Sequence, residues 1–184
     1  MSDSAGAEGH LAAFLEALDA GSSDPEMQGT PERVAELFRE LFRGLHEPAP
    51  GLSPFPNPND DGSPILIREL HFHSMCAHHL LPFFGRIDIA YVPGQAIGGV
   101  GAFPRVVAHF AARPQVQERL VREILDHLVA ELSPAGLLVM SRARQLCMEM
   151  RGSRSRGELV CSAAMGTLAV GGQCRAEVLA ALAQ

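Results

Sequence analysis

Two cysteines and one histidine could bind a metal ion in this chain. Cys76 and His79 are three residues apart, a separation that places two side chains on one face of a helical turn, and Cys147 can supply a third ligand. Two thiolates and one imidazole suit zinc. No Cys-x-x-Cys pair is present to close the site, so the fourth tetrahedral position is left for water. The pattern therefore favours a catalytic zinc site over a structural one.

A further histidine stands beside this set. His78 directly precedes His79, so the two imidazoles diverge, and one can bind metal while the other faces a substrate as acid or base. That division of labour suits a hydrolase. Isolated cysteines and histidines are more often packed than reactive, and spacing alone leaves both interpretations open. Cys161 and Cys174 are interpreted as ordinary small apolar residues.

Several motifs together resemble the GTP cyclohydrolase I family in their order and spacing. They occupy residues 76–79, 81–85, 113–119 and 147–152, and the resemblance runs from about residue 30 to residue 163. It implies an enzyme in which zinc-bound water attacks C8 of the guanine imidazole ring. It identifies Cys76, His79 and Cys147 as the Zn²⁺ ligands and His78 as the acid that protonates N7.

The same resemblance assigns substrate contacts. Gln117 and Glu118 match a Gln-Glu pair whose carboxylate accepts hydrogen bonds from the guanine edge, whereas the residue types alone would equally suit a solvated helix surface. Arg105 and Arg151 match arginines that hold ribose and phosphate, and a planar guanidinium suits bidentate phosphate contact. Gln145 is the fifth expected substrate contact.

Three positions depart from the family pattern. Ala77 replaces a glutamate beside the zinc ligands, and residues 99–102 read Gly-Val-Gly-Ala where the family has Gly-Leu-Ser-Lys, which removes a hydroxyl and an ammonium that bind triphosphate. Gln145 stands where the family has a second catalytic histidine. Glutamine can donate a hydrogen bond but cannot exchange a proton near neutral pH, so the later steps, including loss of formate, should fail or slow.

These departures lead to one preferred hypothesis and two alternatives. The preferred hypothesis is a zinc-dependent hydrolase that opens the imidazole ring of a guanine-type purine lacking a triphosphate and stops at the formamide. The first alternative is an ordinary GTP cyclohydrolase I that makes dihydroneopterin triphosphate and formate, with Arg154 and Arg156 taking the phosphate. The second is a non-catalytic subunit that binds purine or pterin and keeps zinc for stability.

Composition excludes several other classes. The chain has 184 residues, a net charge of -6 and a pI near 5.7, so it has no general basic field for nucleic acid. No apolar run is long enough to span a membrane, and the first residues lack the pattern of a secretory signal, so we expect a cytoplasmic protein. All 15 basic residues are arginine, which rules out a lysine base or Schiff base.

The elements that must position these residues follow from periodicity and punctuation. A first helix is expected over residues 10–20, and Gly21 ends it. Further helices are expected from Thr30-Pro31 onward, over residues 103–112 and over residues 115–132. Strands are expected over residues 65–73, 86–92, 136–143 and 159–170, with a short C-terminal helix after them. Residues 46–64 contain six prolines and are expected to form a long irregular connection.

Runs of strands with helices on one side indicate an α+β fold with an antiparallel sheet. This order matches the T-fold of the resembled family, in which a helical hairpin covers one face of the sheet. We expect an N-terminal helix and linker over residues 1–29 and the T-fold domain over residues 30–184. By resemblance, subunits should close their open sheet edges by assembling into a β-barrel, as a homodecamer of two pentamers with active sites between subunits.

Overall fold

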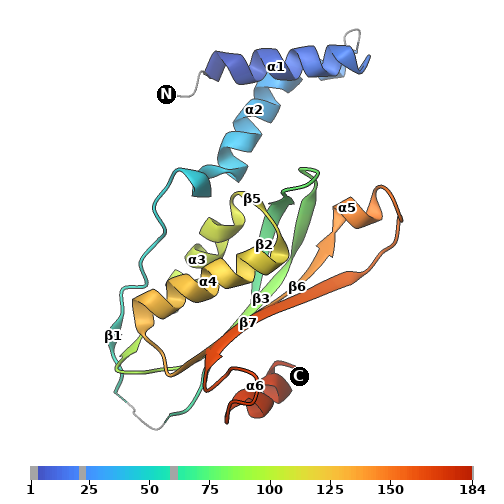
Figure 1. The fold of residues 1–184 in the computed structure, drawn as a ribbon. Coiled ribbons are helices and arrows are strands. Elements are labelled where there is room, and N and C mark those ends of the chain that lie inside the picture. The colour runs from blue at the N-terminus through green and yellow to red at the C-terminus, as the bar shows by residue number, and fades with distance from the viewer. Residues whose placement is uncertain (1–3, 21–23, 59–61, 184) are drawn as a thin grey trace. The chain divides into compact units, whose positions relative to one another are not determined.

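The computed structural model describes residues 4–20, 24–58 and 62–183 (Figure 1). The chain forms two compact units, residues 1–43 and 44–184. The expected division at residue 29 stays a prediction. Within the described residues, no helix combines the length and apolar character that crossing a membrane requires.

The first unit contains helices α1 (Ser4–Ala17) and α2 (Thr30–Leu41) and a 3-10 turn, η1 (Pro25–Met27). Helix α1 begins earlier than its apolar spacing predicts, and the expected stop at Gly21 lies outside the described residues. Gly29 caps α2 in the left-handed region, with φ 72°, a conformation that glycine adopts without a steric penalty. An ion pair of 2.8 Å between Arg39 and Glu8 joins the two helices.

The second unit is built on a five-stranded sheet with the strand order β5-β2-β3-β6-β7. Strands β2 (Ile65–Cys76), β3 (Pro82–Val92), β6 (Gly136–Gln145) and β7 (Glu158–Gly166) are antiparallel neighbours. Strand β5 (Pro114–Gln115) pairs in parallel with the end of β2. A separate pair is formed by β1 (Phe55–Pro56) and β4 (Ala96–Ile97), and a 3-10 turn, η2, covers Arg43–Leu45.

A helical hairpin covers one face of this sheet. Helices α3 (Ala102–Ala111) and α4 (Gln117–Leu132) lie across it, and their apolar faces pack on inward side chains of β3 and β6 (Figure 1). Ile87, Leu120 and Leu137 are fully buried in this core. The expected α+β architecture, with an antiparallel sheet and a hairpin on one face, is confirmed. The short helix α5 (Leu146–Glu149) follows β6.

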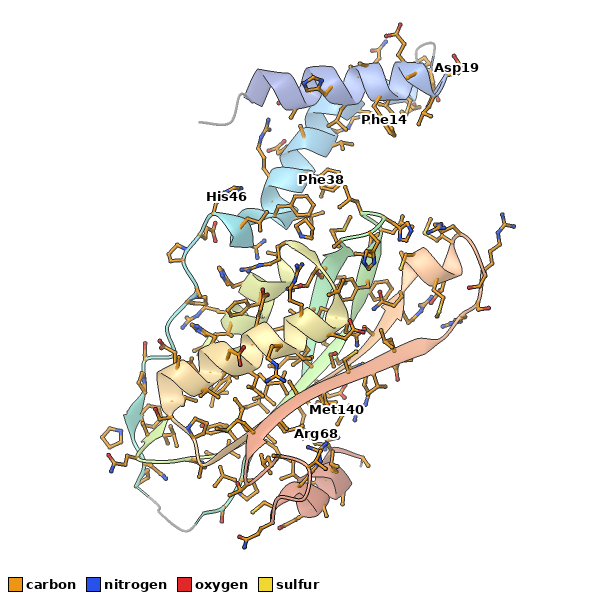
Figure 2. The ribbon with its side chains drawn as sticks, in the orientation of Figure 1. Phe14, Asp19, Phe38, His46, Arg68 and Met140 are labelled. Carbon is orange, nitrogen blue, oxygen red and sulfur yellow. The ribbon has the colours of Figure 1, made fainter. Side chains whose placement is uncertain are left out.

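The C-terminal helix α6 (Arg175–Leu182) packs on the opposite face of the sheet (Figure 1). Its residues Val178 and Leu182 form a second, smaller core with Ala90 and Leu138, which alternate with the residues of the main core along β3 and β6. The sheet is therefore covered on both faces at one end. The rest of this second face carries several charged side chains, including Arg68, together with apolar ones such as Met140 (Figure 2).

The strands differ in extent from the sequence-based expectation. Strands β2 and β3 run on to the turn between them, because the ladder continues through Ser74 and Phe83 to Met75 and Pro82. The metal motif therefore starts on a strand and not in a loop. Strand β7 ends at Gly166, whose φ of 59° turns the chain away.

The proline-rich connection over residues 46–64 is more firmly anchored than expected. Leu52 is fully buried in the main core. Its backbone N–H donates to a carboxylate oxygen of Glu131 at 3.0 Å, and His127 Nε2 lies 3.0 Å from the carbonyl oxygen of Pro50. The described part of this segment is thus held against α4.

Candidate active site

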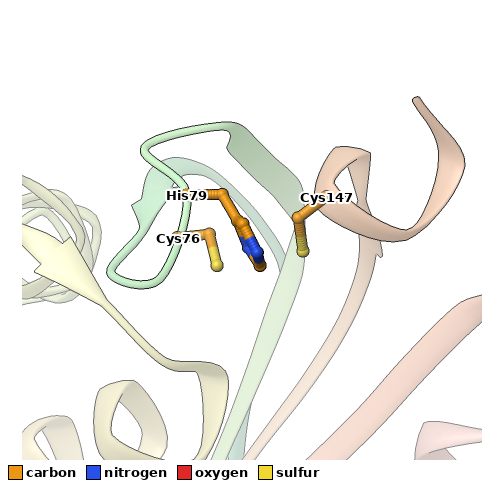
Figure 3. A group of neighbouring side chains, drawn as sticks. All are labelled: Cys76, His79 and Cys147. Carbon is orange, nitrogen blue, oxygen red and sulfur yellow. The ribbon is translucent and has the colours of Figure 1, made fainter. Parts of the chain in front are cut away.

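The structure brings Cys76, His79 and Cys147 together, with their ligand atoms within 4.8 Å of one another (Figure 3). Cys76 is the last residue of β2, and the following turn is closed by the N–H groups of His79 and Leu80, which both donate to its carbonyl oxygen. Cys147 comes from α5, directly after strand β6. Strands β2 and β6 are both antiparallel to β3, which lies between them, so they run in the same direction and deliver both halves of the site to one end of the sheet.

The donor set fits a zinc ion. Two sulfurs and an imidazole are ligands that zinc prefers, and three of them leave an open position. Burial, followed by the neighbouring Cys76 thiol, raises the pKa of the Cys147 thiol above its ordinary value. Two sulfurs this close cannot both ionise cheaply without a cation, so a bound divalent metal would resolve that conflict.

His78 and His79 diverge, as the sequence suggests. Their ring centroids are 6.1 Å apart and the rings are inclined by 73°. His78 Nδ1 lies 3.8 Å from the Cys76 sulfur, and the His78 side chain lines the pocket beside the metal group, whereas Nε2 of His79 contacts a guanidinium N–H of Arg151. His79 thus belongs to the Cys-His-Cys group that could hold a metal ion, and the His78 side chain lines the pocket beside it.

A pocket of about 340 Å³ adjoins the metal group. Its walls come from the start of α4, the end of β6, α5 and the start of β7. The residues that line it are Cys76, His78, Gln115, Val116, Gln117, Glu118, Gln145, Cys147, Met148, Glu158 and Leu159. Two of the expected metal ligands, Cys76 and Cys147, therefore meet the expected acid and the Gln-Glu pair around one cavity, although these residues are distant in sequence.

Gln117 and Gln145 are bonded to each other. The Gln145 side-chain amide donates to Gln117 Oε1 at 2.7 Å, and Gln117 Nε2 donates to Ser141 Oγ at 2.8 Å and to the Leu159 carbonyl oxygen at 2.9 Å. Gln117 is buried. Both ends of its amide are therefore used within the described part of the chain, so Gln117 links α4 to β6 and β7 as well as bordering the pocket.

Glu118 lies at the rim of the pocket. Its side chain is exposed and lies beside the Cys161 thiol. Burial, followed by the charge and hydrogen bond of Glu118, raises the pKa of Cys161 to about 11. Cys161 is thus a partly buried, protonated neighbour of the Glu118 carboxylate and is not a member of the metal group.

The arginines are placed differently. Arg151 follows α5 and touches His79, at the edge of the metal group. Arg105 lies on the exposed side of α3 and is not among the described residues that line the 340 Å³ pocket. The sequence analysis missed Glu158 and Gln115, which do line it. Gln115 was expected to start a helix, and only its pairing with Cys76 in β5 reveals its place.

Comparisons with known proteins point in one direction. The family model described as GTP cyclohydrolase I matches residues 7–183. A GTP cyclohydrolase 1 from Bacillus pumilus is 39% identical over 172 residues, which cover 91% of this chain and 91% of that protein. One from Aquifex aeolicus is 43% identical over 155 residues, 83% of this chain and 81% of that protein. One from Leifsonia xyli is 40% identical over 185 residues, 97% of this chain and 94% of that protein.

Proposed function

Because the chain belongs to the GTP cyclohydrolase I family, we propose that it is a zinc-dependent hydrolase that opens the imidazole ring of GTP and carries the reaction to dihydroneopterin triphosphate and formate. The observation that carries this proposal is that the Cys-His-Cys group, through Cys76 and Cys147, borders the pocket that His78 and Glu118 also line. The relatives named above share about two fifths of their residues with this chain and are all named GTP cyclohydrolase 1.

Cys76, His79 and Cys147 would hold the zinc ion. When bound, zinc supplies Lewis-acid activation of water near neutral pH. His78 faces the pocket and exchanges the proton at N7 of the purine, because an imidazole titrates near neutrality. Glu118 accepts hydrogen bonds from the guanine edge at the rim of the pocket.

Phosphate recognition falls to arginines around the site. Arg151 lies against His79, and Arg154 and Arg156 follow it in an exposed segment. Guanidinium groups bind phosphate oxygens in bidentate fashion, so these side chains can replace the missing serine and lysine at positions 101 and 102. Arg105 is exposed on α3 and does not line this pocket, so it would serve a site on a neighbouring subunit.

The position of Gln145 supports a second candidate function, in which the protein opens the ring of a substrate without triphosphate and stops at the formamide. Gln145 borders the pocket where the family has a histidine, and its amide is bonded to Gln117. An amide cannot exchange protons near neutral pH, so steps after the first hydrolysis lack that group. The named relatives favour the complete reaction over this candidate, which the sequence analysis preferred.

Product analysis separates the candidates. Zinc-loaded protein is incubated with GTP, GMP, guanosine and guanine, and the products are identified by mass spectrometry together with a formate assay. Dihydroneopterin triphosphate and formate from GTP would support the proposal. Gain of one water without formate would replace it with the second candidate. If no purine is turned over although zinc is bound, the result would instead support the non-catalytic binding subunit.

Assembly belongs to the same proposal. Strand β7 is an outer strand of the sheet, and its Leu159 and Val160 side chains are exposed. Unpaired sheet edges with apolar side chains are normally covered. We therefore expect a homo-oligomer, a decamer of two pentamers built as a β-barrel in the cytoplasm, with active sites between subunits. Light scattering coupled to gel filtration measures its mass.

A further inference from the structure

The second face of the sheet carries a cluster of arginines and histidines that the proposed reaction does not use. Backbone register places His71, Arg86 and Arg142 opposite one another across β2, β3 and β6. The next row on the same face contains His73, Phe84 and Arg144, in that order. Because side chains alternate along a strand, both rows point away from α3 and α4.

These rows line a groove of about 630 Å³, larger than the pocket beside the metal group. Its wall is completed by residues of α6 and by the bend in β2. The residues that line it are Arg68, Glu69, His71, Phe72, His73, Phe84, Gly85, Arg86, Arg142, Ala143, Arg144, Glu158, Leu182 and Ala183. Glu158, at the start of β7, is the one residue that borders both cavities among the described lining residues.

The arginines that line the groove have N–H donors without an acceptor among the described residues. Arg86 faces Arg142 directly across two strands, and like charges in that position destabilise a sheet. Arg86 is paired with Glu69 at 2.5 Å and Arg142 with Asp88, but each guanidinium carries five N–H donors. Arg68 is exposed and makes no side-chain hydrogen bond or ion pair with any described residue. Arg142 also donates to the carbonyl oxygen of Leu182 at 3.5 Å, so the N–H donors without an acceptor among the described residues belong chiefly to Arg68 and Arg86.

The backbone around these arginines is specially shaped. The register of β2 shifts between Ile67 and Leu70, and Glu69 within this bulge has a φ of 61°, which is costly for a side chain larger than glycine. The buried Asp88 carboxylate holds the distortion, since it accepts the Glu69 N–H at 2.9 Å and also binds Arg142. Asp88 thereby fixes the bulge and one arginine of the groove at the same time.

Arg144 is held in a comparable way. Its Nε and Nη2 donate to the two carboxylate oxygens of Glu149 at 3.0 and 2.6 Å. Its guanidinium carbon lies 5.6 Å from the centroid of the Phe84 ring, and the His73 ring stacks on the same ring at a centroid distance of 5.7 Å. The side chains of this row are therefore ordered before any ligand binds, which reduces the entropy lost on binding.

We propose that this groove is an anion-binding site for a phosphate-bearing small molecule, separate from the metal pocket. The groove lining presents four guanidinium groups and two imidazoles against two carboxylates, Glu69 and Glu158. The ion pairs of Asp88 with Arg142 and of Glu149 with Arg144 offset part of this positive charge. Recognition of an anion therefore rests on guanidinium N–H donors that lack an acceptor more than on net charge. Planar guanidinium groups match phosphate oxygens in bidentate geometry. Arg68, Arg86 and Arg142 would make the contacts.

Equilibrium dialysis of the zinc-loaded full chain against radiolabelled inorganic phosphate tests the proposal, at low salt so that screening is weak. The double variant Arg68→Gln/Arg86→Gln should bind phosphate at least about tenfold more weakly, because two charge-assisted contacts are lost. Arg122→Gln is the matched control, since this exposed arginine lies on α4, on the other side of the sheet. It should bind as the unchanged protein does.

A second pair of variants separates the groove from the proposed active site. Arg105→Gln/Arg151→Gln should leave phosphate binding at the groove in place while GTP turnover falls. Loss of phosphate binding in that variant, or undiminished binding in the groove variant, would overturn the proposal, as would the absence of binding to the unchanged protein. If the groove double variant unfolds, Arg68→Gln alone decides, because that side chain has no partner among the described residues to lose.

Discussion

The side-chain amides of Gln117 and Gln145 are hydrogen-bonded to each other, and both residues line the 340 Å³ pocket beside the metal group. Gln145 directly precedes α5, which carries Cys147, while Gln117 opens α4 and is followed by Glu118. One hydrogen bond thus connects the segment that presents a metal ligand with the segment that presents the expected guanine acceptor. A residue that departs from the family pattern in chemistry still has a structural partner here.

Replacing Gln145 tests this link. In Gln145→Ala the buried Gln117 Oε1 loses its donor, and we expect the free energy of unfolding to fall by about 1–3 kcal/mol, the usual cost of an unsatisfied buried acceptor. Urea unfolding followed by circular dichroism measures it. Ser155→Ala is the control, because this hydroxyl is exposed and bonds only locally. Equal stability of the two variants would contradict the link.

The metal ligands make a sharper prediction. In Cys147→Ser a poor zinc ligand replaces a thiolate, and we expect zinc content to drop and GTP turnover to fall by about a hundredfold or more. Metal analysis and the product assay report the two effects. Cys174→Ser should retain zinc and activity, since Cys174 packs against the second core. Chelation of the unchanged protein should reproduce the loss, and added zinc should reverse it.

Cys161 reports on Glu118 through its titration. Its pKa of about 11 in the folded protein means that the thiol stays mostly protonated at pH 9, so alkylation there should be slower than in the unfolded chain. Glu118→Gln removes the negative charge and the carboxylate hydrogen bond that raise the Cys161 pKa, but it leaves the thiol buried. The Cys161 pKa should therefore fall without reaching its ordinary value, and alkylation should become faster. Mass spectrometry of iodoacetamide-treated protein locates the modification. An unchanged alkylation rate in Glu118→Gln would show that Glu118 does not influence the titration of Cys161.

At the scale of elements, the site depends on two strand ends. Strand β2 ends at Cys76, and β6 passes into α5 at Leu146, beside the same turn. Strand β3 lies between them and pairs with both, so its register sets how far apart the two thiols stand. Gly85 allows this close pairing, because a Cβ there would lie 1.9 Å from the Arg142 carbonyl oxygen.

The proline-rich connection is an element of the fold in its own right. Leu52 is fully buried, and its truncation in Leu52→Ala should lower the free energy of unfolding by about 2–5 kcal/mol through lost burial and an internal cavity. Thermal and urea unfolding measure the change. Val170→Ala removes a side chain that is 91% exposed and should be nearly neutral. A neutral Leu52→Ala would show that the connection is not anchored.

At the scale of the whole molecule, the outer strand β7 leaves apolar side chains uncovered. If subunits associate along this strand, Val160→Glu places a charge in the interface and should shift the protein to smaller species in light scattering. Val170→Glu adds the same charge at an exposed position outside the sheet and should leave the mass unchanged. A protein that is monomeric before mutation would contradict the assembly expected from the family.

The metal group shows how far sequence reasoning reached. Cys76, His79 and Cys147 were predicted from ligand type and spacing and from family motifs, and the structure places their donor atoms within 4.8 Å. Gln115 and Glu158 were not predicted as pocket residues, because no local pattern marks them. They reach the pocket through pairings with β2 and β6, which join residues far apart in the chain.

The sequence by itself determined the order of the main helices and strands, the α+β class and the family, and it singled out the Cys-His-Cys group, because local periodicity and motif spacing are properties of short segments. Tertiary structure alone decided that Gln145 bonds Gln117, that Leu52 enters the core and that arginines from β3 and β6 share a groove. Each of these depends on strand register or on long-range packing. Both arise from the free energy of the whole folded chain and not from any single segment.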